Sequence, residues 1–117
     1  MRPLILASSF LFLVLSNAVS AEEIYLNCVL KYKPTTQISL SYNTKDNTGK
    51  EYVGQGLSIP YVLKLTDSDI TLIRRGDDGK IYRSWNINRF NGDAGLYSPS
   101  VSSELISYSC SKATKKL

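Results

Sequence analysis

The sequence contains no histidine, and this absence removes several kinds of active site. Without an imidazole there is no Ser-His-Asp or Cys-His catalytic set and no histidine ligand for a metal. A glycine-rich phosphate loop and a dinucleotide-binding glycine pattern are also missing. The aspartates fall mostly in turn-forming stretches, and no spacing suggests a carboxylate pair for glycoside hydrolysis. The sequence therefore predicts a non-enzymatic protein with no cofactor and no metal site.

Apolar runs are lacking except near the start of the chain. A basic beginning is followed there by an apolar run over residues 4–15 and by small residues that end at Ala21. This pattern predicts a secretory signal peptide over residues 1–21. The run is shorter than the about 20 apolar residues that span a bilayer. We therefore expect an exported protein, periplasmic or extracellular, with one mature domain over residues 22–117 and no membrane span in it.

Cysteine occurs only twice, at Cys28 and Cys110. An even number of cysteines in an exported chain favours a disulfide. Each cysteine lies on the apolar side of an alternating stretch, EIYLNCVLKY or LISYSC, as expected for two strands. A bond between them would close a loop of about 80 residues, worth roughly 4.5 kcal/mol in the chain-entropy model. Because no Cys-x-x-Cys motif is present, a redox role is not predicted.

Helical periodicity is absent from residues 22–117, whereas Tyr, Ile, Val and Thr are frequent and turn residues recur throughout. This pattern is typical of an all-β protein. We predict a small antiparallel up-and-down barrel of about eight strands, closed by pairing of the two cysteine-bearing strands. A two-sheet β-sandwich is the alternative. The apolar inner residues are sufficient to fill such a barrel, so we expect a packed core rather than a ligand-filled interior.

Turn residues predict the register of three consecutive hairpins. The three predicted turns are Asp67-Ser68 and the type I′ candidates Asp78-Gly79 and Asn91-Gly92. The predicted partners across them are Leu65 with Ile70, Leu63 with Leu72, Leu72 with Trp85, Ile70 with Ile87, Ile87 with Leu96, and Asn86 with Tyr97. A common inner face of Leu63, Leu65, Ile70, Leu72, Trp85, Ile87 and Leu96 follows. A looser turn is expected within residues 42–52, and a short one at Lys33-Pro34-Thr35.

The stretch RRGDDGK, residues 74–80, contains an Arg-Gly-Asp tripeptide and two adjacent carboxylates. The predicted register places Arg75 opposite Tyr82 at the end of a strand, rather than on a protruding loop. A calcium site needs six to eight oxygens, and the regular Asp-x-Asp-x-Asp-Gly spacing is missing. We interpret the stretch as a hairpin, with Arg74 opposite Arg83 as an unfavourable like-charge pair.

Four residues form the candidate binding surface on the outer face of these hairpins: Arg75, Tyr82, Asn86 and Tyr97. Tyrosine and arginine with amide neighbours can bind a sugar or a protein. The alternative is that they are ordinary strand residues facing water. We therefore expect an exported, non-catalytic module that binds a protein or glycan of the cell envelope or the extracellular space. Nucleic acid is not an expected partner, because an exported protein rarely meets it.

Two C-terminal stretches, WNINRFNG and YSCSKATKKL, contain an Ile-x-Arg-x-x-Gly hairpin and a terminal Cys followed by lysines. With the Cys of the first strand, they resemble a group of small exported bacterial proteins that have no assigned activity. The overall plan is also similar to the periplasmic C-type lysozyme inhibitors, which are secreted, disulfide-stapled, eight-stranded barrels. Their Ser-Gly-x-x-Tyr loop, which enters the lysozyme cleft, is missing from this sequence. The resemblance implies an alternative function, as an inhibitor of a cell-wall hydrolase such as lysozyme.

Overall fold

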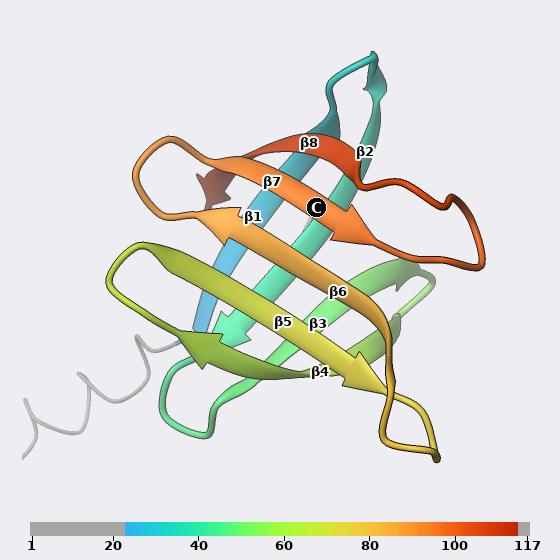
Figure 1. Cartoon of the computed structure of the whole chain (residues 1–117). Coiled ribbons are helices and arrows are strands. Elements are labelled where there is room, and N and C mark those ends of the chain that lie inside the picture. Colours follow the sequence, from blue (N-terminus) through green and yellow to red (C-terminus); the bar gives the residue numbers. More distant parts are fainter. Residues whose placement is uncertain (1–22, 115–117) are drawn as a thin grey trace, which may run out of the picture.

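The structure is a computed structural model that describes residues 23–114, so the predicted signal peptide lies outside the described residues. The regular secondary structure of residues 23–114 consists of eight β-strands. The strands, shown in Figure 1, are β1 (Glu23–Leu30), β2 (Lys33–Asn43), β3 (Thr48–Gly54), β4 (Leu57–Leu65), β5 (Asp69–Arg75), β6 (Ile81–Asn88), β7 (Asp93–Tyr97) and β8 (Ile106–Ala113).

The eight strands form one closed antiparallel barrel. Each strand pairs with its neighbours in the chain, and β8 returns to pair with β1. Cys28 and Cys110 lie directly opposite each other in that last ladder, and a disulfide joins them. Closure gives each of the eight strands a paired neighbour on both sides. The predicted barrel and its disulfide are therefore confirmed, and the two-sheet alternative is not formed.

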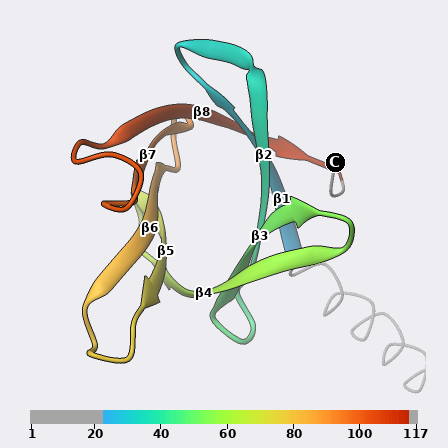
Figure 2. The ribbon, with the colours of Figure 1, turned by 90° about the vertical axis from the view of Figure 1, so that its right-hand side faces the viewer.

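The barrel has two different ends. The terminal end is formed by the start of β1, the end of β8 and the turns after β2, β4 and β6. The loop end carries the turns after β1, β3 and β5 and the longer β7–β8 connection. Figure 2 faces the loop end: the strands form a ring, and the β3–β4 hairpin bends outward beside β2.

Alternate side chains of every strand fill the ring. Trp85 lies at the centre, fully buried, with its ring centroid 4.9 Å from that of Tyr108. The predicted inner face is correct except for Leu65, which is 38% exposed. Leu65 ends β4 at the terminal end, and the pairing of β3 with β4 stops at Val62, so Leu65 has a neighbouring strand on one side only. The other buried apolar side chains are Leu26, Cys28, Leu40, Tyr42, Tyr61, Leu63, Ile70, Leu72, Ile87, Ala94, Leu96 and Cys110.

The register predicted for the β4–β5 hairpin is confirmed, but that for β6–β7 is wrong by two residues. Ile87 lies opposite Ala94 rather than Leu96, and Asn86 lies opposite Gly95 rather than Tyr97. A shift of two residues keeps every side chain on its predicted face. The inward-facing residues of β6 and β7 were therefore predicted correctly from a wrong pairing.

The longer β6–β7 loop explains the shift. The Asn88 side chain accepts hydrogen bonds from the N–H groups of Phe90 and Asn91, and the N–H of Gly92 donates to the Asn88 carbonyl. Gly92 has φ of 80°, whereas Asn91 does not have a positive φ. The loop is thus a four-residue turn organised by Asn88, and not the predicted type I′ turn.

The β5–β6 hairpin has the predicted register as far as Arg74, which lies opposite Arg83. Beyond that pair β6 contains one extra residue, Tyr82, so Arg75 lies opposite Ile81 instead. This β-bulge makes the predicted pairing of Arg75 with Tyr82 wrong.

The tip of this hairpin also differs from a type I′ turn. Gly79 has φ of 82°, as predicted, but Asp78 does not have a positive φ. The N–H of Gly76 donates to the Lys80 carbonyl, and the N–H of Gly79 donates to the Gly76 carbonyl. The result is a three-residue loop in which Asp77 is a loop residue.

The first turn is earlier than predicted. Residues 33–35 belong to β2, and the chain turns at Lys31 and Tyr32. Leu30 lies opposite Lys33, whereas Val29 lies opposite Gln37, so residues 34–36 bulge from the ladder. Proline cannot donate a ladder hydrogen bond, which fits its place in the bulge.

Candidate functional site

The sequence-predicted surface is exposed, but its residues do not meet as expected. The Arg75 guanidinium donates to the Gly79 carbonyl at 3.0 Å, within its own hairpin. Tyr82 instead contacts Arg74, whose guanidinium carbon lies 5.7 Å from the ring centroid and whose Nε donates to the hydroxyl. Cation and ring are therefore adjacent, but the cation is a different arginine from the predicted one.

The other two predicted residues lie on the outer faces of β6 and β7. Asn86 donates from its amide to the hydroxyl of Thr71 on β5 at 3.2 Å. Tyr97 lies opposite Ser84 and is 41% exposed. That Arg75, Tyr82, Asn86 and Tyr97 bind a partner stays a prediction.

A buried polar network inside the loop end is the feature that the sequence reasoning missed. Glu51, on β3, has a side chain that is 5% exposed, and its carboxylate is surrounded by donors. Arg83 donates to both carboxylate oxygens, at 3.1 and 2.8 Å, and Trp85 donates from its indole N–H at 3.1 Å. Tyr61 donates its hydroxyl proton to the same carboxylate. Arg83 also donates to the Ser98 hydroxyl at 3.0 Å, which ties the network to the start of the β7–β8 loop.

This network also resolves the like-charge pair in the β5–β6 ladder. Arg83 turns into the barrel toward Glu51, whereas Arg74 donates to the Pro60 carbonyl at 3.0 Å. The two guanidinium groups thus have different partners.

Burial and hydrogen bonding act in opposite directions on the pKa of Glu51. Burial raises the pKa of Glu51. Hydrogen bonds from Arg83, Tyr61 and Trp85, together with the charge of Arg83, lower it by more than burial raises it, so the net shift is downward. For Tyr61, burial and the adjacent Glu51 carboxylate raise the pKa well above its ordinary value. Burial lowers the pKa of Arg83, but Glu51 outweighs this and raises it. Glu51 is therefore a carboxylate, Arg83 a cation and Tyr61 a neutral donor at physiological pH.

A carboxylate in this state is poorly suited to proton transfer. A general acid or base needs a pKa near the working pH and access to substrate. The pKa of Glu51 is shifted away from neutrality, and protein donors surround the carboxylate. We assign the network a structural role, which is to fix the positions of β3, β4 and β6 at the loop end.

The outer face of β2 carries a polar groove of about 380 Å³. Its floor comes from Gln37 and Ser39 on β2 and from Tyr52 on β3, and the β3–β4 turn forms its other wall. The Tyr52 hydroxyl lies 3.0 Å from that of Ser41, and its ring centroid lies 6.3 Å from that of Tyr25. These contacts hold the aromatic floor of the groove in place.

The groove wall has an unusual backbone. Gly54, Gln55 and Gly56 have φ of 99°, 52° and 78°, and a register shift precedes them between Tyr52 and Gly54. Gln55 and Gly56 form a tight two-residue turn with both φ angles positive, as a type I′ turn requires. A glutamine in this region is uncommon, and such strain is often found at functional positions. This turn, which the sequence reasoning did not identify, places Gln55 at the groove.

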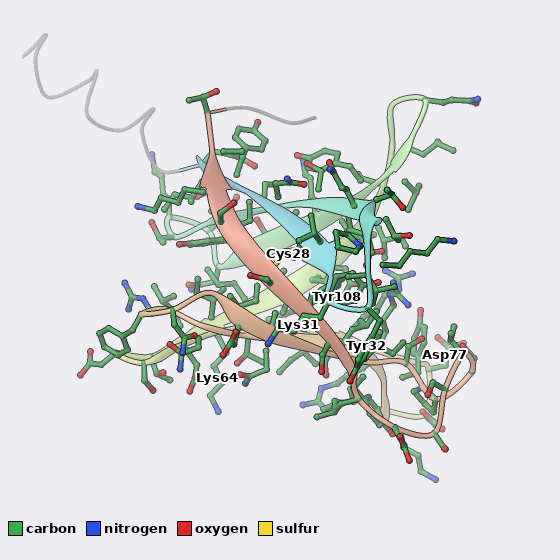
Figure 3. All side chains as sticks on the ribbon, turned by 90° about the horizontal axis from the view of Figure 1, so that it is seen from above. Cys28, Lys31, Tyr32, Lys64, Asp77 and Tyr108 are labelled. Atoms are coloured by element: carbon green, nitrogen blue, oxygen red, sulfur yellow. A yellow bond between two sulfur atoms is a disulfide. The ribbon has the colours of Figure 1, made fainter. Side chains whose placement is uncertain are left out.

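Exposed apolar side chains mark the tip of the loop end. Tyr32 is 87% exposed, and Val101 and Leu105 in the β7–β8 loop are 70% and 66% exposed. The N–H of Lys31 donates to the Ser107 carbonyl at 3.0 Å, which joins the first turn to the end of this loop. Tyr32, labelled in Figure 3, lies in the turn between β1 and β2 at this end.

Comparisons of the chain with models of known protein families, with curated proteins and with solved structures gave no significant match. Within residues 23–114, no three or more carboxylates, cysteines or histidines gather in a way that could hold a metal ion. Over the same residues, no helix has the length and apolar character needed to cross a membrane.

Proposed function

We propose that the protein is an exported, non-catalytic β-barrel module that binds a glycan of the cell envelope in the groove beside β2. The groove itself carries the proposal, because its chemistry suits a sugar. Glutamine amides both donate and accept hydrogen bonds, as sugar hydroxyls do. Gln37 and Gln55 supply two such amides to the groove. A few polar groups fixed on a rigid scaffold are the usual basis of specific small-ligand binding.

Export and a non-catalytic role rest on separate observations. The disulfide between Cys28 and Cys110 suits an oxidising compartment, in agreement with the predicted signal peptide. The buried carboxylate, Glu51, is engaged by Arg83, Tyr61 and Trp85. Binding is therefore better supported than turnover.

Titration of the mature protein with N-acetylglucosamine tetramer and with soluble muropeptide fragments, followed by amide NMR shifts, tests the glycan proposal. We expect the largest shifts at residues 37–39 and 52–57. Gln55→Gly removes the amide but tolerates the positive φ, so the fold is retained. This variant and Gln37→Ala should each weaken binding about fivefold, as expected for one hydrogen bond.

Asn86→Ala is the matched control, because it removes an exposed amide from the outer face of β6. It should leave glycan binding unchanged. If neither glycan shifts the groove residues at millimolar concentration, or if Asn86→Ala weakens binding as much as the groove variants, the groove is not the glycan site.

Inhibition of a cell-wall hydrolase is the second candidate, favoured by the exposed Tyr32, Val101 and Leu105. Exposed aromatic and apolar side chains at one end of a barrel are typical of protein-binding surfaces. A turbidity assay with lysozyme and cell-wall suspension tests it: inhibition should be lost in Tyr32→Ser and retained in Gln55→Gly. Full lysozyme activity at saturating protein would end this candidate.

A further inference from the structure

The terminal end of the barrel contains a second cavity, of about 480 Å³, whose chemistry differs from that of the groove. Its apolar wall is formed by inner-face residues of β1, β5 and β6, and its rim by the β6–β7 loop and the end of β8. The apolar residues are Ile24, Leu26, Ile70 and Ile87. Three of them, Leu26, Ile70 and Ile87, are nearly covered, so the cavity is a shallow mouth rather than a deep tunnel.

The rim is held in place by the packing of one loop against β8. The N–H of Cys110 donates to the Gly92 carbonyl at 2.8 Å. A side chain at Gly92 would overlap the backbone of Cys110, so the loop lies directly on the strand. Because β7 pairs with β8 only as far as Ser109, the residues of β8 beyond that point border the opening.

Tyr42 places one polar group in this mouth. The residue is 5% exposed and lines the cavity, and no hydrogen bond within residues 23–114 engages its hydroxyl. Burial raises the pKa of Tyr42, although the charge of Arg89 opposes this, so the hydroxyl keeps its proton. It is therefore a hydrogen-bond donor that faces the cavity without a protein partner.

Two cations line the same opening. Lys112 lies opposite Leu26 in the β8–β1 ladder, which places it on the inner face of the barrel. Arg89 also lines the cavity, and its guanidinium donates to the Thr66 carbonyl at 2.6 Å, which ties it to the β4–β5 turn. Among residues 23–114, the cavity lining includes both cations and no carboxylate. A concave site with charge of one sign attracts ligands of the opposite sign.

We propose that this terminal-end mouth binds a small organic anion with an apolar body, such as a short-chain alkyl or aryl carboxylate. The apolar part would contact the isoleucines, while the carboxylate would accept hydrogen bonds from the Tyr42 hydroxyl and face Lys112 and Arg89. The shallow floor favours a short body over a long acyl chain. This site is independent of the proposed glycan groove, because none of the groove residues lines it.

The test uses octanoate as the probe and the mature, disulfide-bonded protein, with binding followed by amide NMR shifts. We expect shifts at residues 88–92 and 110–112 that weaken as salt is raised. Octanol, which has the same apolar chain without the charge, should bind at least fivefold more weakly. Tyr42→Phe removes only the hydroxyl and should weaken octanoate binding about fivefold. Lys112→Met should weaken it about two- to fivefold.

Lys64→Met is the matched control, because Lys64 is an exposed lysine that points outward from β4 (Figure 3). It should bind octanoate as the wild type does. The proposal is overturned if octanol binds as well as octanoate, or if the shifts fall outside the terminal end. It is also overturned if Tyr42→Phe and Lys112→Met, both folded, bind octanoate like Lys64→Met.

Discussion

Replacing Arg83 by methionine should make the stability of this protein depend on pH between 5 and 7. Methionine keeps a long unbranched side chain but removes the guanidinium that pairs with Glu51. Glu51 would then be a buried carboxylate with two remaining donors, Tyr61 and Trp85, and no counter-charge. Loss of one partner from a buried ion pair costs about 3–5 kcal/mol.

Protonation of Glu51 limits that cost. The penalty for keeping the carboxylate charged cannot exceed the cost of protonating it, about 1.4 kcal/mol for each pH unit above its ordinary pKa of 4.5. The limit is therefore about 3 kcal/mol at pH 7 and below about 1 kcal/mol at pH 5. Acidification should recover about 2 kcal/mol in Arg83→Met, because protonation becomes easier in the folded variant.

The wild type should behave differently over this range. Its Glu51 has a lowered pKa, so the stabilisation from this group is complete above the ordinary pKa of 4.5 and is lost only as the pH falls below it. Because the chain has no histidine, no other side chain with an ordinary pKa titrates between pH 5 and 7. The pH dependence of the variant can therefore be assigned to Glu51.

Urea unfolding at pH 5, 6 and 7, followed by the fluorescence of the single tryptophan, measures these differences. Arg74→Met is the matched control, because Arg74 lies opposite Arg83 but donates to the Pro60 carbonyl and the Tyr82 hydroxyl. It should lose at most about 1 kcal/mol at every pH. Equal destabilisation of Arg83→Met at pH 5 and pH 7 would refute the reasoning.

Three further outcomes are expected. Gly79 and Gly92 have nearly the same positive φ, but an added Cβ meets no atom at Gly79 and the Cys110 backbone at Gly92. Gly79→Ala should therefore cost about 1 kcal/mol and Gly92→Ala at least twice that, measured by urea unfolding; equal losses would contradict the close packing. Cys28 and Cys110 are 82 residues apart, so reduction of their disulfide should lower the free energy of unfolding by about 4.5 kcal/mol and lower the melting temperature. Titration of two thiols in the unreduced, denatured protein would show that the bond is absent in solution. Mass spectrometry of the exported protein should show cleavage after Ala21, and retention of residues 1–21 would contradict the predicted signal peptide.

The barrel was predictable from the sequence because alternation and the cysteine pair point to the same closure. Each cysteine lies on the apolar side of its stretch, and the structure buries both in the β1–β8 ladder. Loop details were less predictable, because they depend on side-chain to backbone bonds. The Asn88 side chain lengthens the β6–β7 loop, and Tyr82 inserts a bulge into β6. Neither feature changes the apolar pattern from which the register was predicted.

Glu51 was missed because the pattern of β3 is misleading. In the stretch GKEYV, the aromatic Tyr52 suggests that its own face is the buried one, which would place Glu51 outside. In the structure Glu51 points into the barrel and Tyr52 points outward. Tyr52 is accommodated there because it packs near Ser41, a buried residue on the outer face of β2. A signal for the buried carboxylate was nevertheless present. Arg83 and Trp85 are two residues apart on one strand, so their side chains point to the same face. A cation and an indole N–H that both point into the barrel require a hydrogen-bond acceptor there.

The position of that carboxylate makes the two ends of the barrel unequal. At the loop end, Glu51, Arg83 and Tyr61 occupy the interior with mutually satisfied polar groups, so binding there must use outer surfaces such as the groove beside β2 and the exposed Tyr32. At the terminal end, the hydroxyl of Tyr42 has no hydrogen-bond partner within residues 23–114, and no carboxylate of these residues lines the cavity beside Arg89 and Lys112. Because the opening leaves this hydroxyl in contact with solvent, it can exchange a water partner for an oxygen of a ligand. The polar groups of the loop end are thus satisfied within the protein, whereas the Tyr42 hydroxyl at the terminal end is available to the organic anion that we propose.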